Sequence, residues 1–127
     1  MKDFRRLTVW ERAHALTLEI YKDTATFPRE ELFAITSPLR RSSASIAANI
    51  AGGCGRTRNG KFHRFLNAAA RSAVELEYFL LLSPDLKLVS KSTYESLHAG
   101  VCEVQRMLAS LIRKVDAARR EKLVASC

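Results

Sequence analysis

The residues of this chain best suited to chemistry are cations on a glycine-rich segment. Arg56, Arg58 and Lys61 lie within residues 55–61, which also contain two glycines, and Arg64 follows three residues later. Guanidinium groups on such a turn can adapt to phosphate oxygens, and the N-terminus of a following helix offers free amide donors. The chemistry to expect is the binding of a phosphate backbone, with no covalent bond made or broken.

A second group of cations lies near the C-terminus and completes the candidate nucleic-acid site: Arg113, Lys114, Arg119 and Arg120. If the helices run alternately up and down, the N-terminus, residues 55–61 and the C-terminus meet at one end. That end then carries fifteen basic and five acidic residues, and the other end carries six basic and eight acidic residues, within a net charge of +8. A basic end attracts RNA or DNA without reading sequence, and its affinity falls steeply with salt. The alternative is a solvated surface that keeps the protein soluble.

Catalytic and metal-binding chemistry is not indicated. His14, His63 and His98 are expected on three different helices at different heights, where they cannot share a metal ion. Glu75 and Glu77 are two residues apart and therefore point to different faces of a helix. We expect no enzyme activity, no metal and no cofactor.

Cysteine usage and hydropathy point to a reducing compartment. Cys54, Cys102 and Cys127 are odd in number and lack CxxC spacing, so neither a disulfide framework nor a zinc site is predicted, and all three are expected as reduced thiols. No apolar run approaches the length needed to span a bilayer, and the N-terminus lacks the apolar core of a signal peptide. We expect a cytoplasmic protein with no membrane partner.

Four helices must position the basic residues. The first is predicted over residues 8–26, with a capping box of Thr8 and Glu11. The second is predicted over residues 37–51, capped by Ser37 with Pro38 in its first turn and ended by the glycines that follow. Their apolar residues recur at helical spacing. These are Val9, Ala13, Leu16 and Ile20 in the first helix and Leu39, Ser43, Ile46 and Ile50 in the second.

The third helix is predicted over residues 59–82, ending at Ser83-Pro84. The fourth is predicted to start with a capping box of Ser92 and Glu95 and to carry a coiled-coil-like seam as far as Ala118. The inward residues of the third helix are Phe62, Leu66, Ala69, Ala73, Leu76 and Leu80. Those of the fourth are Tyr94, Leu97, Val101, Val104, Leu108, Leu111, Val115 and Ala118.

The chain is expected to fold as one domain over residues 1–127. Its 127 residues suit a single core, 47% of them are hydrophobic, and no strand candidate interrupts the helices. Short connections favour antiparallel neighbours. The predicted fold class is all-α, an antiparallel up-down-up-down four-helix bundle.

Several motifs together resemble the 23S rRNA intervening-sequence protein family. The motifs are Leu39-Arg40-Arg41-Ser42, Ser45-Ile46, Asn49-Ile50-Ala51, and Gly53 followed by Arg56. The resemblance covers about the first two-thirds of the chain, but Gly52 stands where the family has an acidic residue. It implies a four-helix bundle that assembles as a ring of five, here a homopentamer. It implies no assigned activity, since the family name records that some members are encoded within 23S rRNA genes.

The resemblance also suggests residues for a subunit interface or a structural role: Trp10, Tyr21, Arg40, Arg41, Asn49 and Phe65. Apolar residues outside the predicted seams, such as Leu18, Phe79, Met107 and Ile112, either broaden the core or join that interface. Arg40 and Arg41 stand near a helix N-terminus, where cations are unfavourable unless paired. We therefore expect salt bridges from them, within or between subunits.

A second resemblance bears on mechanism. The chain is similar to the accessory variability determinants of diversity-generating retroelements, which are basic pentameric bundles that work with a reverse transcriptase and nucleic acid. This implies a non-enzymatic nucleic-acid scaffold, with RNA, DNA or a reverse transcriptase as partner. The alternative is a structural or protein-interaction ring without a nucleic-acid ligand, whose basic end meets an acidic protein.

Overall fold

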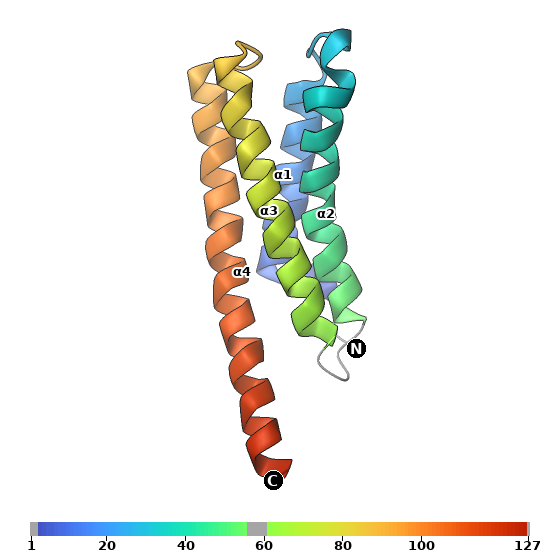
Figure 1. Cartoon of the computed structure of the whole chain (residues 1–127), viewed down its shortest axis with the longest axis vertical. Helices are drawn as coiled ribbons and strands as arrows, with labels where there is room; N and C mark the ends of the chain where they lie inside the picture. The colour runs from blue at the N-terminus through green and yellow to red at the C-terminus, as the bar shows by residue number, and fades with distance from the viewer. Residues whose placement is uncertain (1–2, 56–60, 127) are drawn as a thin grey trace.

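The fold is a bundle of four long helices, and the expected all-α class is confirmed. A computed structural model describes residues 3–55 and 61–126, which contain no strand. The long helices run alternately up and down and pack in a cycle, in which α1 and α3 each contact both α2 and α4 (Figure 1). Their bounds are α1 Thr8–Thr24, α2 Ser37–Cys54, α3 Lys61–Asp85 and α4 Lys91–Ser126. Short helical turns precede α1 and α2: η1 Phe4–Arg6, η2 Arg29–Glu31 and η3 Leu32–Thr36.

The starts of α1 and α4 differ from the predicted capping boxes. Leu7 precedes α1 in an extended conformation and makes no side-chain cap, so the capping box of Thr8 and Glu11 is wrong. The hydroxyl that caps α4 belongs to Ser90, whose Oγ accepts a hydrogen bond from the Thr93 amide at 3.1 Å. Ser92 already lies inside α4, where its own amide is part of the first turn.

The start of α2 also differs from the prediction, because Ser37 is not a cap. Its backbone is helical (φ −62°, ψ −47°), and the π turn Leu32–Thr36 leads directly into α2. Pro38 sits in the first turn, as expected, where its missing amide proton costs little. The chain therefore enters α2 from consecutive helical turns that begin at Arg29, directly after the extended Pro28.

The glycines near the end of α2 serve packing. Gly52 and Gly53 lie within the helix, which continues to Cys54, so the prediction that they end it is wrong. A Cβ on Gly53 would come within 2.8 Å of Phe62 Cδ1 and 2.9 Å of Phe65 Cβ, and one on Gly52 within 2.9 Å of the Phe65 ring. The missing side chains let the first turns of α3 lie against α2.

The connection between α3 and α4 is closed by a C-terminal cap on α3. Pro84 is accommodated in the last turn, so α3 ends at Asp85, three residues beyond the predicted end. Lys87 has a positive φ of 59°, and the amides of Leu88 and Lys87 bond the carbonyls of Ser83 and Pro84 at 2.9 Å. This is a Schellman motif with lysine in the position that glycine usually takes.

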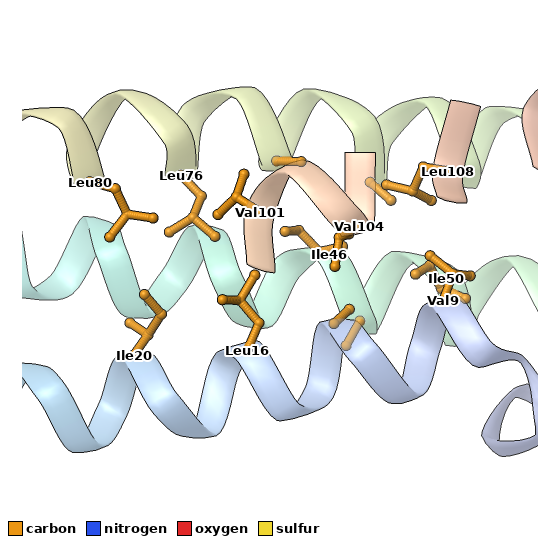
Figure 2. Packing of buried hydrophobic residues seen from close by; sticks show 14 of the residues in the cluster. Val9, Leu16, Ile20, Ile46, Ile50, Leu76, Leu80, Val101, Val104 and Leu108 are labelled. Atoms are coloured by element: carbon orange, nitrogen blue, oxygen red, sulfur yellow. The ribbon is translucent and has the colours of Figure 1, made fainter. Parts of the chain in front are cut away.

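The core lies between all four helices. Figure 2 shows its labelled side chains: Val9, Leu16 and Ile20 from α1, Ile46 and Ile50 from α2, Leu76 and Leu80 from α3, and Val101, Val104 and Leu108 from α4. The predicted inward residues of α1 and α2 are all buried, and so are those of α3 except Phe62, which is half-buried against the core. On α4 the prediction holds as far as Val115, but Ala118 is exposed.

The last part of α4 projects beyond the bundle. Figure 1 shows the C-terminal end of α4 extending past the other three helices. Residues 117–125 are all exposed, and we call residues 117–126 the overhang. None of the described helices is apolar enough over a sufficient length to cross a membrane.

Candidate nucleic-acid interface

The structure brings six of the eight predicted nucleic-acid residues to one end of the bundle. Lys61 and Arg64 lie in the first turn of α3 and are exposed. The other four are exposed on the C-terminal half of α4: Arg113, Lys114, Arg119 and Arg120. Arg56 and Arg58 lie outside the described residues.

A contact between α3 and α4 fixes how these two groups of cations face each other. His63 Nδ1 lies 2.6 Å from Asp116 Oδ1, and the side chains of both are about one-third exposed or less. Asn67 Nδ2 lies 3.1 Å from His63 Nε2 and 3.4 Å from His63 Nδ1, and it donates to the His63 carbonyl at 3.0 Å. Sequence reasoning considered His63 only as a metal ligand and missed this link.

Part of the positive charge at this end is balanced within the chain. Arg5 Nε lies 3.1 Å from Asp3 Oδ1, and the hydrogen bonds from Arg5 lower the pKa of Asp3. Arg12 pairs with Glu103 at 3.6 Å, and Arg119 Nη1 lies 3.9 Å from Asp116 Oδ1. These exposed ion pairs contribute little to stability, but they reduce the positive electrostatic potential around them.

Five of the six described nucleic-acid candidates make no ion pair with another described residue. We call this set the basic end: Lys61, Arg64, Arg113, Lys114 and Arg120. Cations without acidic neighbours keep their full charge for a ligand. The arrangement can bind anions.

Arg40 and Arg41 act at helix contacts and not at the basic end. Arg40 donates to Thr24 Oγ1 at 2.9 Å and to the Tyr21 carbonyl at 3.3 Å, and its guanidinium lies 4.7 Å from the centre of the Tyr21 ring. Arg40 thus lies at the C-terminal end of α1, where the helix dipole favours a cation. It makes hydrogen bonds to neutral groups in place of the salt bridge that was expected. Arg41 makes the expected ion pair within the chain, with Glu75 of α3 at 3.7 Å.

Three of the other residues proposed for a subunit interface have partners inside the chain. Asn49 donates to the Ser45 carbonyl at 2.8 Å, and Ser45 Oγ lies 2.9 Å from Ser72 Oγ across the α2–α3 contact. Trp10 packs on the core and lies between the rings of Phe4 and His14. Phe65 lies against Gly52 and Gly53. Tyr21 also has a partner within the chain, the Arg40 guanidinium over its ring, but 46% of its surface is exposed.

A stripe of exposed apolar residues on α3 was missed by sequence reasoning. Val74, Tyr78 and Leu81 are 61%, 55% and 51% exposed and recur at i, i+4 and i+7, which places them on one face of the helix. Leu18 and Tyr21 form a smaller exposed pair on α1. Because α1 and α3 lie diagonally across the bundle, these two faces point in opposite directions. In the sequence, this stripe is visible as a second set of apolar residues at helical spacing, offset from the residues of the third helix that face the core.

Comparison with known proteins finds a matching protein family and a solved structure with a similar fold. A family model described as 23S rRNA-intervening sequence protein matches residues 5–110. A crystal structure of a protein of unknown function from the S23 ribosomal protein family of Bacteroides thetaiotaomicron is 27% identical, with a TM-score of 0.74. The match covers 83% of this chain and 98% of that chain. No curated protein matches the sequence. The cations from Arg113 onward lie beyond the part of the chain that the family model covers.

Proposed function

The chain belongs to the 23S rRNA-intervening sequence protein family, and we propose that it is a non-enzymatic, oligomeric bundle that binds the phosphate backbone of RNA or DNA. It would serve as a scaffold or accessory factor. The observation that carries this proposal is the basic end, where five exposed cations have no acidic partner among the described residues.

The physical basis is the release of counterions from the nucleic acid. Each phosphate neutralised by a lysine or arginine frees condensed cations, so binding is favourable without base contacts and weakens as salt rises. Cations on two helices can span neighbouring phosphates of one backbone, and the contact of His63 with Asp116 keeps the two helices in register. Arg56 and Arg58, which lie between α2 and α3 in the sequence, are further candidates for phosphate contact.

The test is a salt titration of binding to a labelled structured RNA and to a duplex DNA, made on protein of known oligomeric mass. Removing four charges of the basic end should weaken binding and flatten its salt dependence. The four substitutions to alanine are at Lys61, Arg64, Arg113 and Lys114. The control variant removes the same number of exposed charges toward the opposite end, at Lys22, Arg29, Lys87 and Lys91. Equal losses in both variants would contradict a localised site and leave only an effect of net charge.

We propose a homopentameric ring as the assembled form. Support comes from the family resemblance and from the two exposed apolar faces, one on α1 and one on α3, which point in opposite directions. Two different faces that meet head to tail make a heterologous contact, which closes into a ring when the rotation between neighbouring subunits divides a full turn and otherwise forms an open filament. Tyr78→Glu should therefore lower the mass measured by light scattering to that of a monomer, while Val124→Glu on the overhang should leave it unchanged. A monomeric parent chain would contradict the proposal.

A protein-interaction ring without a nucleic-acid ligand is the second candidate. The observation that favours it is Phe33 in η3, which is 84% exposed beside α2 and is not part of either apolar face. In that case the basic end would meet an acidic protein or a reverse transcriptase. Absence of RNA and DNA binding even at low salt, with the ring intact, would favour this candidate.

A further inference from the structure

A cluster of three metal-ligand side chains lies on the contact between α3 and α4. Glu77 comes from α3, and His98 and Cys102 come from successive turns of α4; their ligand atoms all lie within 4.8 Å of one another. From this geometry we propose that Glu77, His98 and Cys102 bind a divalent transition metal ion, with zinc as the best match. The site is separate from the basic end and does not depend on nucleic-acid binding.

The distances suit one ion bound by all three residues. His98 Nε2 lies 3.6 Å from Glu77 Oε2 and 3.7 Å from Cys102 Sγ. Bonds of about 2.0–2.3 Å from zinc to nitrogen, oxygen and sulfur put the ligand atoms of a tetrahedron roughly 3.3–3.7 Å apart. The third pair, Glu77 and Cys102, has its ligand atoms within 4.8 Å, so the three atoms can become ligands with side-chain adjustments of about an ångström.

Neighbouring side chains hold the ligands in place. Gln105 Nε2 donates to Glu77 Oε1 at 3.1 Å, which occupies one carboxylate oxygen and leaves Oε2 toward His98. Tyr94, one turn before His98, stacks on the imidazole with ring centres 5.5 Å apart. Partners of this kind orient ligands and raise metal affinity. All three ligand residues are half-buried, so an ion could enter from solvent without unfolding.

The donor set selects the kind of metal. One thiolate, one imidazole and one carboxylate suit zinc and cobalt, whereas calcium and magnesium prefer oxygen ligands alone. Binding converts the Cys102 thiol to a thiolate, and its proton is released to solvent. Three protein ligands leave one tetrahedral position for water. Bound metal would join α3 to α4 and stabilise the fold by mass action.

Sequence analysis missed this site for two reasons. His98 and Cys102 are four residues apart and face the same side of α4, but histidines and cysteines were weighed as separate groups. The third ligand, Glu77, is supplied by a different helix and joins the pair only through tertiary packing.

The first measurement is titration of the intact, reduced protein with cobalt(II), followed by competition with zinc. We expect one ion per chain, with the thiolate-to-cobalt charge-transfer band and the intense visible bands of a tetrahedral ion. Zinc should displace cobalt, release about one proton per ion near neutral pH and raise the melting temperature. Absence of the charge-transfer band, or binding only at millimolar metal, would overturn the proposal.

Matched variants assign the ligands. His98→Gln, Cys102→Ser and Glu77→Gln should each lose the tetrahedral spectrum, while His14→Gln, Cys127→Ser and Glu75→Gln should keep it. Gln105→Leu should retain the ligands but weaken zinc binding by about 10-fold to 100-fold. Circular dichroism of the metal-free variants verifies that they fold. If the control variants lost the spectrum while the ligand variants kept it, the metal would bind elsewhere and the proposal would be wrong.

Discussion

The covered part of α4 and its overhang carry the same kinds of apolar residue in opposite environments. Val104 is 1% exposed and packs in the core, whereas Val124, on the same helix, is 75% exposed. The difference comes from the neighbours, because α1 and α3 cover the first part of α4 and do not extend along the overhang (Figure 1). A helical apolar pattern therefore states which face can be buried, and the lengths of the other helices decide where burial stops.

The polar residues of the covered part of α4 and those near the overhang also differ in their contacts. In the covered part, Glu103 pairs with Arg12 and Gln105 bonds Glu77, so polar side chains tie α4 to its neighbours. Near the overhang, Asp116 faces both His63 and Arg119, while Arg113, Lys114 and Arg120 have no acidic partner among the described residues. The covered part of α4 is thus suited to stability and the uncovered part to binding.

The largest effect is expected from replacing a valine by alanine, once in the covered part of α4 and once in the overhang, and measuring the stability of each variant. Val104→Ala should lower the free energy of unfolding by about 2 kcal/mol, because it leaves a cavity in the core. Val124→Ala should change it by less than about 0.5 kcal/mol. Urea denaturation of the two variants measures the difference. Equal losses would break the comparison and show that the overhang is packed against another surface in solution.

Removal of the overhang should separate stability from binding. A chain that ends at Asp116 loses three cations and should bind structured RNA about tenfold less tightly, with a salt slope smaller by up to about 3. Its melting temperature should stay close to that of the parent chain, since residues 117–125 are exposed. Full-length Arg119→Ala/Arg120→Ala controls for chain length and should show most of the binding loss. Unchanged affinity would exclude the overhang from the site.

Asp116 lies at the border between the covered part of α4 and the overhang, so its substitution should change both stability and RNA binding. Asp116→Asn removes the negative charge next to His63 and should cost about 1 kcal/mol of stability. It should also tighten RNA binding, because an acidic group among cations is lost. Glu121→Gln, on the overhang, is the matched control and should tighten binding without a loss of stability. A stability loss of similar size in both variants would contradict the role of the His63 contact.

The smallest effect is expected at the opposite end of the bundle, away from the basic end. Burial, followed by the nearby charge of Glu19, raises the pKa of Asp23. A carboxyl group with a raised pKa in the folded state destabilises the fold when it is ionised, so Asp23→Asn should increase stability at pH 7 by less than about 0.5 kcal/mol. The gain should shrink as the pH falls through the range in which Asp23 takes up its proton. A gain that stays constant with pH would show another cause.

Much of the fold follows from local sequence patterns, and the helix ends show where such patterns stop being sufficient. The core seams of α1, α2 and α3 are predicted residue by residue, since apolar spacing reports a helix face directly. The capping boxes at Thr8 and Ser92 fail because a hydroxyl caps a helix only if the chain is extended at that residue. At Ser37 the preceding π turn removes that condition.

The candidate nucleic-acid interface could likewise be predicted from the sequence only in part. Its cations are evident from residue type and from their position relative to the predicted helix ends. Their pairing is less evident. Arg119 pairs with Asp116 three residues earlier on the same helix, but Arg12 meets Glu103 only through helix packing. Lys61 and Arg64 have no acidic partner among the described residues. The cluster of Glu77, His98 and Cys102 is likewise assembled from two helices.

The sequence by itself determined the helices, their buried faces, the family and the concentration of positive charge at one end. These properties depend on residue type and on spacing within one segment. Only the tertiary structure decided which cations remain unpaired, where α4 leaves the bundle, which apolar residues stay exposed on α3, and which side chains meet across the α3–α4 contact. These depend on the register between helices, which arises from packing such as that of Phe62 and Phe65 against Gly53.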